Sequence, residues 1–288
     1  MYPSRFRYES PHSLDEALAL LRDHGDEAKV LAGGQSLVPL LKLRFAAPGL
    51  LVDINRVPGL DHLTKDPDGT LHVGALCRHA TLERSAMLAD GHPVMASAAP
   101  LIADPIVRNR GTLVGSLCHS DPQGDWASVL LALGGHIVAA GPAGQRTIAA
   151  ADFSLGPFEN ALRPDEIAVE AVVPAARGAV SGTYFKLERR VGDFATVGAA
   201  VALETVGGLV TRAGIALTGV GPSNIQVTAA EQALVGKPLS AESVEEAAQL
   251  AAEAARPRSD HRGSAAYKRH IVATFVRRGL TREEAVAA

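Results

Sequence analysis

The sequence predicts a two-domain protein of the α+β class. Its 288 residues exceed one average domain, and 47% of them are apolar, which is enough to fill two cores. Before about residue 176, short apolar segments of strand type alternate with segments of helical periodicity. After that point three strand-like segments follow one another, and helical segments close the chain. We therefore expect one domain over residues 1–176 and a smaller one over residues 177–288.

Caps and glycines divide the N-terminal domain into elements. Ser13-Leu-Asp-Glu16 is a capping box, in which a hydroxyl and a carboxylate bind free amides at a helix start. A strand over Ala28–Leu31 leads into the Gly33-Gly34 turn, and a helix is expected over residues 37–45 because Pro39 lies in its first turn. Apolar runs predict further strands at residues 50–54, 71–76, 137–140 and 167–173.

The C-terminal domain is expected to hold a three-stranded antiparallel sheet followed by helices. The strand-like runs cover residues 183–188, 196–203 and 210–217, and Gly207-Gly208 forms a hairpin turn between the last two. Ser240 is the expected N-cap of the next helix. A last helix over residues 265–278 carries arginines in its final turn and is expected to end at Gly279.

Composition argues against several classes of function. A net charge of −3 and an aromatic content of 4% disfavour nucleic-acid binding, which needs a basic surface. No apolar run reaches membrane-spanning length and the first residues lack the core of a signal peptide, so we expect a cytoplasmic protein. Cys77 and Cys118 could form one disulfide, but two thiols fit a reducing compartment better. They are too few to hold an iron–sulfur cluster.

The segment Ala32-Gly-Gly-Gln-Ser36 is typical of a phosphate-binding turn. Glycines lack the Cβ that would keep a phosphate from the backbone, and they reach positive φ at little cost. A following helix N-terminus offers unpaired amides, and Ser36 adds a hydroxyl donor. From spacing alone, a plain strand–turn–helix corner remains an equal alternative. The sequence contains neither a Rossmann glycine fingerprint in a strand-to-helix context nor a P-loop lysine motif.

A second glycine-bearing stretch, Arg110-Gly-Thr-Leu-Val-Gly-Ser-Leu-Cys-His-Ser-Asp-Pro-Gln-Gly-Asp125, could hold another part of the same ligand. Gly115 permits close approach, and the hydroxyls of Thr112, Ser116 and Ser120 can donate hydrogen bonds. Its final Asp-Pro-Gln-Gly-Asp is, taken alone, more often a turn than a site. Two such stretches in one chain indicate a cofactor that contains a pyrophosphate.

Together the two stretches resemble the FAD-binding subunit of molybdenum hydroxylases, of the carbon monoxide dehydrogenase medium-subunit type, and the flavin domain of xanthine dehydrogenase. The resemblance covers almost the whole chain, including Leu51-Val-Asp-Ile-Asn55, Arg163-Pro-Asp-Glu-Ile167 and Gly263-Ser-Ala-Ala-Tyr267. It implies a PCMH-type, vanillyl-alcohol-oxidase-like FAD-binding domain made of two α+β lobes, about residues 1–55 and 56–176.

The resemblance also implies which residues contact FAD. One side of the pyrophosphate would be lined by Lys29, Val30, Leu31, Ala32, Gly33, Gly34, Gln35 and Ser36, and the other by Thr112, Gly115 and Ser116. Ile102 falls where the family packs a side chain against the adenine, Asp125 where an acid contacts the ribose, and Leu162 and Lys186 at positions that border the flavin. A cation such as Lys186 would favour the reduced, anionic flavin and raise its potential.

One position departs from the family. The usual double glycine of the second stretch is Val114-Gly115 here. FAD binding is preserved if Val114 turns its side chain outward and offers its amide alone, whereas a required positive φ at this position would force the loop to shift and weaken binding. His119 and Gly124 stand where other members carry hydroxyls. Without the family, the basic cluster of Lys186, Arg189 and Arg190 beside Asp193 would be a solvated or salt-bridged surface.

The function implied is electron transfer inside a molybdenum hydroxylase complex. A molybdenum–pterin cofactor would sit on a large partner and [2Fe-2S] clusters on a small one, in a dimer of heterotrimers, with FAD on this chain. The chain would carry no metal and no catalytic acid or base of its own. A free-standing flavin reductase or oxidase of the same fold is the alternative, and a non-catalytic assembly subunit that has lost FAD is a third reading. The Cys77-Arg-His79 and Cys118-His119 pairs match no common zinc pattern.

Overall fold

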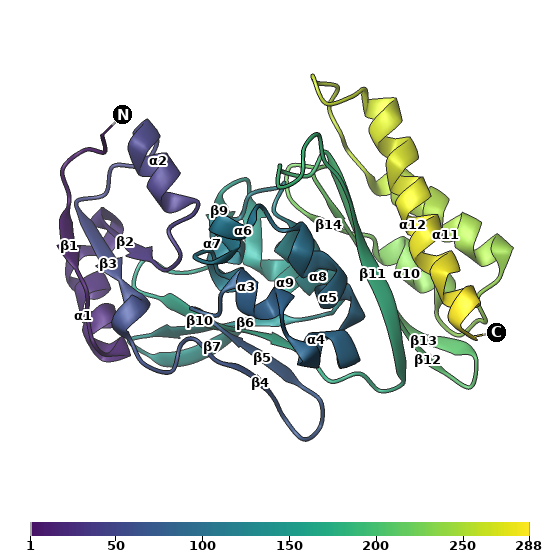
Figure 1. The fold of residues 1–288 in the computed structure, drawn as a ribbon, viewed down its shortest axis with the longest axis horizontal. Coiled ribbons are helices and arrows are strands. Elements are labelled where there is room, and N and C mark those ends of the chain that lie inside the picture. Colours follow the sequence, from purple (N-terminus) through teal and green to yellow (C-terminus); the bar gives the residue numbers. More distant parts are fainter. Residues whose placement is uncertain (1, 288) are drawn as a thin grey trace.

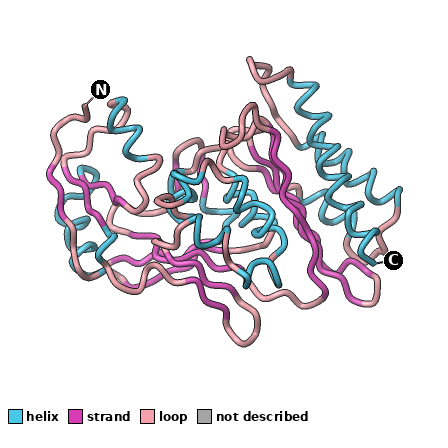
Figure 2. The backbone as a smooth tube through the Cα atoms, viewed as in Figure 1, coloured by secondary structure: helices cyan, strands magenta, loops and turns pink. Residues whose placement is uncertain are grey.

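A computed structural model of the chain describes the backbone of residues 2–287 and the side chains of residues 2–281. Three groups of strands follow one another along its long axis (Figure 1). Helices lie on both sides of the last group, as Figure 2 shows by element type. Within the described residues, no helix combines the length and apolar character that a membrane crossing needs.

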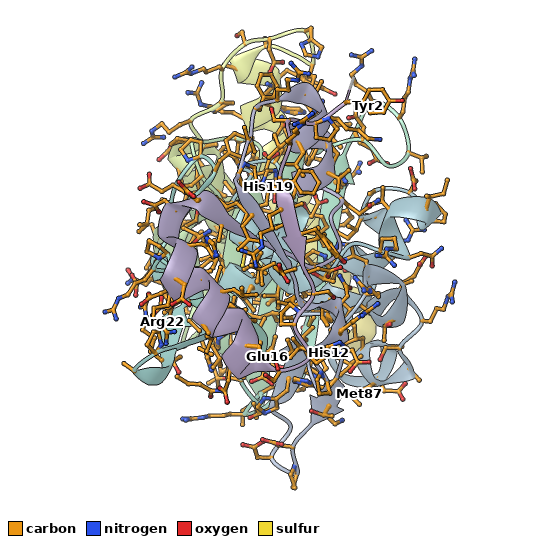
Figure 3. The ribbon with its side chains drawn as sticks, turned by 90° about the vertical axis from the view of Figure 1, so that its left-hand side faces the viewer. Tyr2, His12, Glu16, Arg22, Met87 and His119 are labelled. Atoms are coloured by element: carbon orange, nitrogen blue, oxygen red, sulfur yellow. The ribbon has the colours of Figure 1, made fainter. Side chains whose placement is uncertain are left out.

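The first group is a small parallel sheet of order β1–β3–β2. Its strands are β1 (Arg7–Glu9), β2 (Ala28–Leu31) and β3 (Leu50–Asp53), and its helices are α1 (Leu14–His24), η1 (Gly25–Glu27), α2 (Leu37–Leu43) and η2 (Ile54–Arg56). The Ser13 hydroxyl accepts the Glu16 amide at 3.2 Å, as predicted for the N-cap, and the Glu16 carboxylate accepts the His12 amide at 2.8 Å. Helix α1 buries Ala17 and Leu21 and directs Glu16 and Arg22 outward (Figure 3).

The second group is a five-stranded antiparallel sheet of order β4–β5–β10–β6–β7. Its strands are β4 (Leu63–Lys65), β5 (Leu71–Gly74), β6 (His136–Gly141), β7 (Gly144–Ala149) and β10 (Ile167–Val173). Short helices cover one face of it (Figure 1). They are α3 (His79–Glu83), α4 (Ala86–Gly91), α5 (Pro93–Ala98), η3 (Ala99–Leu101), α6 (Pro105–Arg108), α7 (Leu113–His119), α8 (Asp125–Ala132) and α9 (Ala150–Phe153). A small hairpin of β8 (Ser154–Gly156) and β9 (Glu159–Asn160) follows α9.

The third group is an antiparallel sheet of order β11–β12–β13–β14. Its strands are β11 (Ala179–Leu187), β12 (Val197–Val206), β13 (Leu209–Thr218) and β14 (Ile225–Gln226). The three expected strands are present, and the two-residue β14, too short for a sequence pattern, adds a fourth. Helices α10 (Thr228–Leu234), α11 (Ala241–Ala254) and α12 (Ala265–Ala287) pack on its outer face (Figure 1).

The expected end of the last helix at Gly279 is wrong. Helix α12 continues through this position. A Cβ built at Gly279 would lie 2.7 Å from a methyl carbon of Val201. Glycine is therefore needed here because α12 approaches β12 closely, and a break in the helix is not the reason for it.

Two apolar cores hold the chain together. The larger contains Leu21, Leu50 and Trp126 and extends to Tyr184 on β11, so the C-terminal sheet packs onto helices of the N-terminal part. The smaller lies between that sheet and α10–α12. Eight consecutive residues of β12 are buried, which explains its run of small and β-branched side chains without alternation.

Candidate cofactor site

The first glycine segment joins β2 to α2. Gly34 has a φ of +74°, in the region that favours glycine. Ser36 precedes α2, and its side chain makes no capping hydrogen bond. The carbonyl of Ala32 accepts a hydrogen bond of 2.8 Å from Nδ2 of Asn55, in η2 just after β3. The turn is thus fixed from the neighbouring strand, while Gln35 is exposed.

The middle of the second segment forms helix α7 rather than a loop. Thr112 caps α7, and its hydroxyl accepts the Gly115 amide at 3.1 Å. Val114 has helical backbone geometry, and its side chain is 1% exposed. The side chain packs into the core because it lies on the inner face of a short helix. No positive φ is required there, and the valine causes no backbone strain.

The backbones of the two segments touch. A Cβ added to Gly33 would lie 2.3 Å from the Arg110 carbonyl oxygen and 2.7 Å from Cα of Gly111. Real Cβ atoms do not approach backbone this closely, so only glycine fits at position 33. The two stretches singled out from the sequence therefore form one continuous backbone surface.

A polar connection links the two segments through Arg78. Its guanidinium donates 2.5 Å hydrogen bonds to the carbonyl of Arg110 and to Oδ1 of Asn55, which in turn binds Ala32. The backbone of Arg78 also forms an antiparallel bridge with Thr112. One side chain thus contacts the second segment directly and the first through one amide group.

The connection extends to α8 through the next residue. The His79 amide donates to the Gly111 carbonyl at 3.0 Å, and its Nδ1 accepts the indole N–H of Trp126 at 3.1 Å. Burial lowers the pKa of His79 to about 4, with a smaller contribution from the charges of Arg108 and Arg78. The ring is therefore neutral at pH 7 and carries its proton on Nε2.

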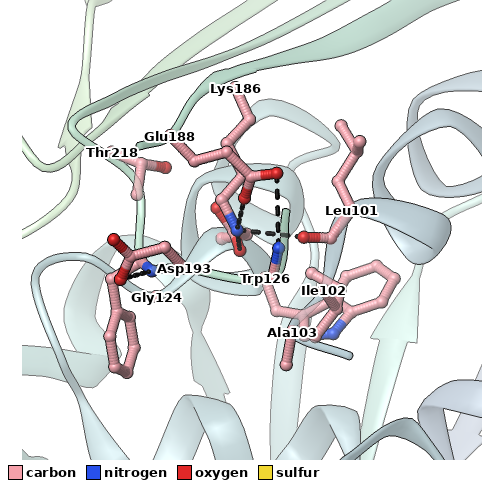
Figure 4. Close-up of polar contacts among 12 residues, drawn as sticks. Leu101, Ile102, Ala103, Gly124, Trp126, Lys186, Glu188, Asp193 and Thr218 are labelled. Atoms are coloured by element: carbon pink, nitrogen blue, oxygen red, sulfur yellow. Dashed lines mark hydrogen bonds and ion pairs between the residues drawn. The ribbon is translucent and has the colours of Figure 1, made fainter. Parts of the chain in front are cut away.

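A second cluster lies where the C-terminal sheet meets α8. The Lys186 ammonium on β11 lies 3.0 Å from the Asp125 carboxylate, 3.4 Å from that of Glu188 and 2.9 Å from the Leu101 carbonyl (Figure 4). Tyr184 donates to the same Asp125 carboxylate at 2.5 Å. The side chains of Lys186 and Asp125 are only 2% and 7% exposed.

Burial dominates the electrostatics of this cluster. It raises the pKa of Asp125, an effect that the neighbouring charge of Lys186 opposes. Burial, together with the Asp125 charge, raises the pKa of Tyr184 well above its ordinary value. Oε2 of Glu188 is buried without a hydrogen bond of its own. The cluster holds two carboxylates against one ammonium, and all three groups belong to this chain.

The other expected site residues fall around these two clusters. Ile102 directly follows Leu101, and its side chain is 7% exposed. Ser116 is partly buried on α7. The segment that carries Leu162 is fastened to the end of α7, because Asn160 donates to the Cys118 carbonyl at 2.7 Å and accepts the Leu162 amide at 3.0 Å.

The structure thus arranges the expected residues in three groups. It joins the two glycine segments, gathers Ile102, Asp125 and Lys186, and leaves Leu162 by the β8–β9 hairpin. The sequence interpretation missed the roles of Asn55, Arg78 and His79. Their only signal was that polar residues lie within five positions of the ends of β3 (Asp53) and β5 (Gly74).

These features fit the diphosphate of a dinucleotide. Two backbone segments without obstructing side chains meet, the Arg78 guanidinium lies beside them, and the charge of Arg110 is near enough to lower the pKa of Arg78. The cysteines are both free thiols, and burial raises the pKa of Cys77 to about 11 and that of Cys118 to about 12. Among the side chains described, no three metal-ligating residues gather at one point.

Comparison with protein families gives two matches that together span most of the chain. Residues 4–176 match the family described as the FAD binding domain in molybdopterin dehydrogenase. Residues 182–282 match the CO dehydrogenase flavoprotein C-terminal domain.

Individual proteins are similar over their full length. The carbon monoxide dehydrogenase medium chain of Hydrogenophaga pseudoflava is 41% identical over 280 residues, 97% of each chain. The 6-hydroxypseudooxynicotine dehydrogenase complex subunit alpha of Paenarthrobacter nicotinovorans is 39% identical over 98% of this chain and 95% of its own. A solved structure of carbon monoxide dehydrogenase from Hydrogenophaga pseudoflava, which lacks the Mo-pyranopterin moiety, superimposes with a TM-score of 0.93 at 43% identity over 98% of both chains.

Proposed function

This chain belongs to the family of FAD-binding medium subunits of molybdopterin-dependent dehydrogenases, and from this membership we propose that it is the electron-transfer flavoprotein of a molybdenum hydroxylase complex. Its fold is the PCMH-type FAD-binding fold, and it is a component of an oxidoreductase. The observation that carries the proposal is the backbone contact between Gly33 and Arg110, which unites two glycine segments 77 residues apart into one surface.

Each part of the chain has a task in this proposal. Residues 1–176, in lobes of about 1–55 and 56–176, bind FAD, and residues 177–288 cover it. This division is supported by the two family matches, which leave only residues 177–181 between them. The two glycine segments bind the diphosphate through main-chain amides and Ser36. Lys186 and Asp125 position β11 against α8 beside the cofactor. When bound, FAD supplies the ability to exchange electrons singly and in pairs.

Other chains would complete the complex. We propose a large partner with the molybdenum–pterin cofactor and a small partner with [2Fe-2S] clusters, assembled with this chain as a dimer of heterotrimers in the cytoplasm. Electrons would arrive from the small partner and leave to an external acceptor. The names of similar proteins support the presence of partner subunits, because they are called a medium chain and a subunit of a complex.

The substrate of the complex is not determined by this chain in our proposal. Two relatives of nearly equal identity, 41% and 39%, carry the names of carbon monoxide and of a nicotine-derived compound. A similar flavoprotein therefore accompanies unrelated substrates. This is what we expect if the substrate pocket lies on another chain.

Purification of the natural protein tests the proposal. A yellow chain with a flavin absorption spectrum that co-elutes with one larger and one smaller partner would support it. A yellow chain that is active alone would favour the free-standing reductase or oxidase. A colourless chain that binds no added FAD would overturn both and leave the assembly subunit.

A further inference from the structure

Arg78 carries a positive charge at the junction of the two glycine segments. Its guanidinium binds the carbonyl of Arg110, and that oxygen is the atom nearest to the position of a Cβ on Gly33. Through Asn55 it also reaches Ala32. The cation therefore lies where both segments can be reached at once.

The charge of Arg78 is not balanced within the described side chains. Neither Arg78 nor Arg110 forms an ion pair within 4.0 Å there. Burial, followed by the charge of Arg110, lowers the pKa of Arg78, while Asp53 and Asp61 oppose this only in part. Asp53 itself binds Asn55 and Tyr8. Two neighbouring arginines without a carboxylate partner are a place where an anion is stabilised.

The guanidinium also has donors to spare. Arginine offers five N–H groups in a planar fork, and the two hydrogen bonds to Arg110 and Asn55 use two of them. These two contacts fix the orientation of the fork, so little side-chain entropy remains to be lost when an anion binds. Phosphate oxygens are the acceptors that match this geometry.

We propose that Arg78 is a cofactor-binding residue that supplies counter-charge to the diphosphate of FAD and holds the two glycine segments at the spacing which that group needs. The inference rests on the proposed function, because it takes FAD as the ligand. The positive charge beside the diphosphate then comes from Arg78, which lies outside both glycine segments. Asn55 helps only to hold the two segments at the right spacing.

The salt dependence of FAD binding distinguishes the counter-charge that Arg78 supplies from the spacing of the two glycine segments. The dissociation constant of FAD is measured on the full-length apo chain by quenching of flavin fluorescence, at 50 mM and 500 mM NaCl. Arg78→Met should bind FAD at least about tenfold more weakly at low salt, and the loss should shrink at high salt because salt screens the missing charge. Asn55→Ala should weaken binding by a similar factor at both salt concentrations.

Two further variants complete the design. Arg78→Lys keeps the charge without the fork, so it should retain the salt dependence of the wild type at lower affinity. Arg22→Met removes the same charge from the outer face of α1 (Figure 3). It should leave the dissociation constant of FAD unchanged at both salt concentrations. If Arg78→Met does not fold, a loss of salt dependence in Arg78→Lys overturns the assignment of charge.

The outcomes distinguish a failure of the role of Arg78 from a failure of the proposed function. A wild-type chain that binds no FAD refutes the proposed function. The role of Arg78 alone is refuted if the wild-type chain binds FAD tightly and Arg78→Met has the same FAD affinity, or the same salt dependence of that affinity.

Discussion

The Lys186 ammonium lies 3.0 Å from the Asp125 carboxylate and joins the C-terminal sheet to the first turn of α8. Both side chains are almost completely buried, and Tyr184 binds the same carboxylate from the same strand as Lys186. The residue expected from the resemblance to border the flavin is thus also a connection between the two parts of the chain. The effect of Lys186 on the flavin potential and its effect on the stability of the chain therefore have to be measured together.

Removal of Lys186 should destabilise the protein. In Lys186→Met the carboxylate of Asp125 stays buried beside Glu188 without a cation, and breaking one partner of such a pair costs about 3–5 kcal/mol. Urea unfolding of the apo chain measures this loss. Adding Asp125→Asn to the same variant should restore part of it, whereas strictly additive losses would show that the pair is not coupled.

The same lysine gives a prediction for the flavin. If its charge acts on FAD, Lys186→Met should lower the reduction potential of the reconstituted protein, because a nearby cation favours the anionic reduced form. Spectroscopic titration with a redox dye measures the potential. An unchanged potential in a folded, FAD-loaded variant would leave Lys186 with the structural task alone.

Gly33→Ala should separate the two glycine segments. The added methyl would meet the Arg110 carbonyl at 2.3 Å, so backbone must move, at a cost of about 1–3 kcal/mol and with at least about tenfold weaker FAD binding. Gly91→Ala is the matched control, because its Cβ meets nothing within 4 Å and its φ is not positive. Equal flavin content in the two variants would contradict the close contact between the segments.

The sequence predicted much of the fold because its signals are local. The N-cap at Ser13, the strand over Ala28–Leu31 and the strand over Ile167–Val173 depend on neighbouring residues, and the structure confirms them. The helix end at Gly279 was predicted wrongly and the orientation of Val114 stayed open, because the surroundings of both residues come from distant segments. Gly279 is explained by its contact with β12, and Val114 by burial in the core of the N-terminal part.

The candidate site, like the fold, was only partly predictable from the sequence. The two glycine segments were visible as sequence motifs, but the path from Asn55 through Arg78 to Arg110 joins three segments that only the fold brings together. A pattern within one segment cannot report such a contact. The side chains that connect motifs are therefore found from the structure, and the motifs themselves from the sequence.

Val114→Gly should lower stability without improving FAD binding. The variant creates the double glycine that the family resemblance implies, but it removes a side chain that is 1% exposed and places a second glycine inside α7. We expect a loss of about 2–4 kcal/mol from the cavity and the helix propensity. Val114→Ala should lose less. A gain in FAD affinity in Val114→Gly would show that the valine hinders the cofactor.

His79 should make the protein less stable in mild acid. Its pKa in the folded chain is about 4 against an ordinary value of 6.5, so between these values the unfolded chain binds a proton that the folded chain excludes. Stability from this group is complete above pH 6.5 and is lost as the pH falls toward 4, by on the order of 3 kcal/mol. Urea unfolding of the apo chain at several pH values between 7.5 and 4.5 measures the slope.

A glutamine at this position isolates the contribution of the ring. His79→Gln keeps an acceptor near the indole of Trp126 but does not titrate, so its stability should fall less steeply with acid than that of the wild type. The difference in stability between the two proteins should therefore narrow as the pH drops from 6.5 to about 4. His92, His119 and His136 also have lowered pKa values and are present in both proteins, so their contribution cancels in the comparison. Parallel pH profiles would mean that folding does not lower the pKa of His79.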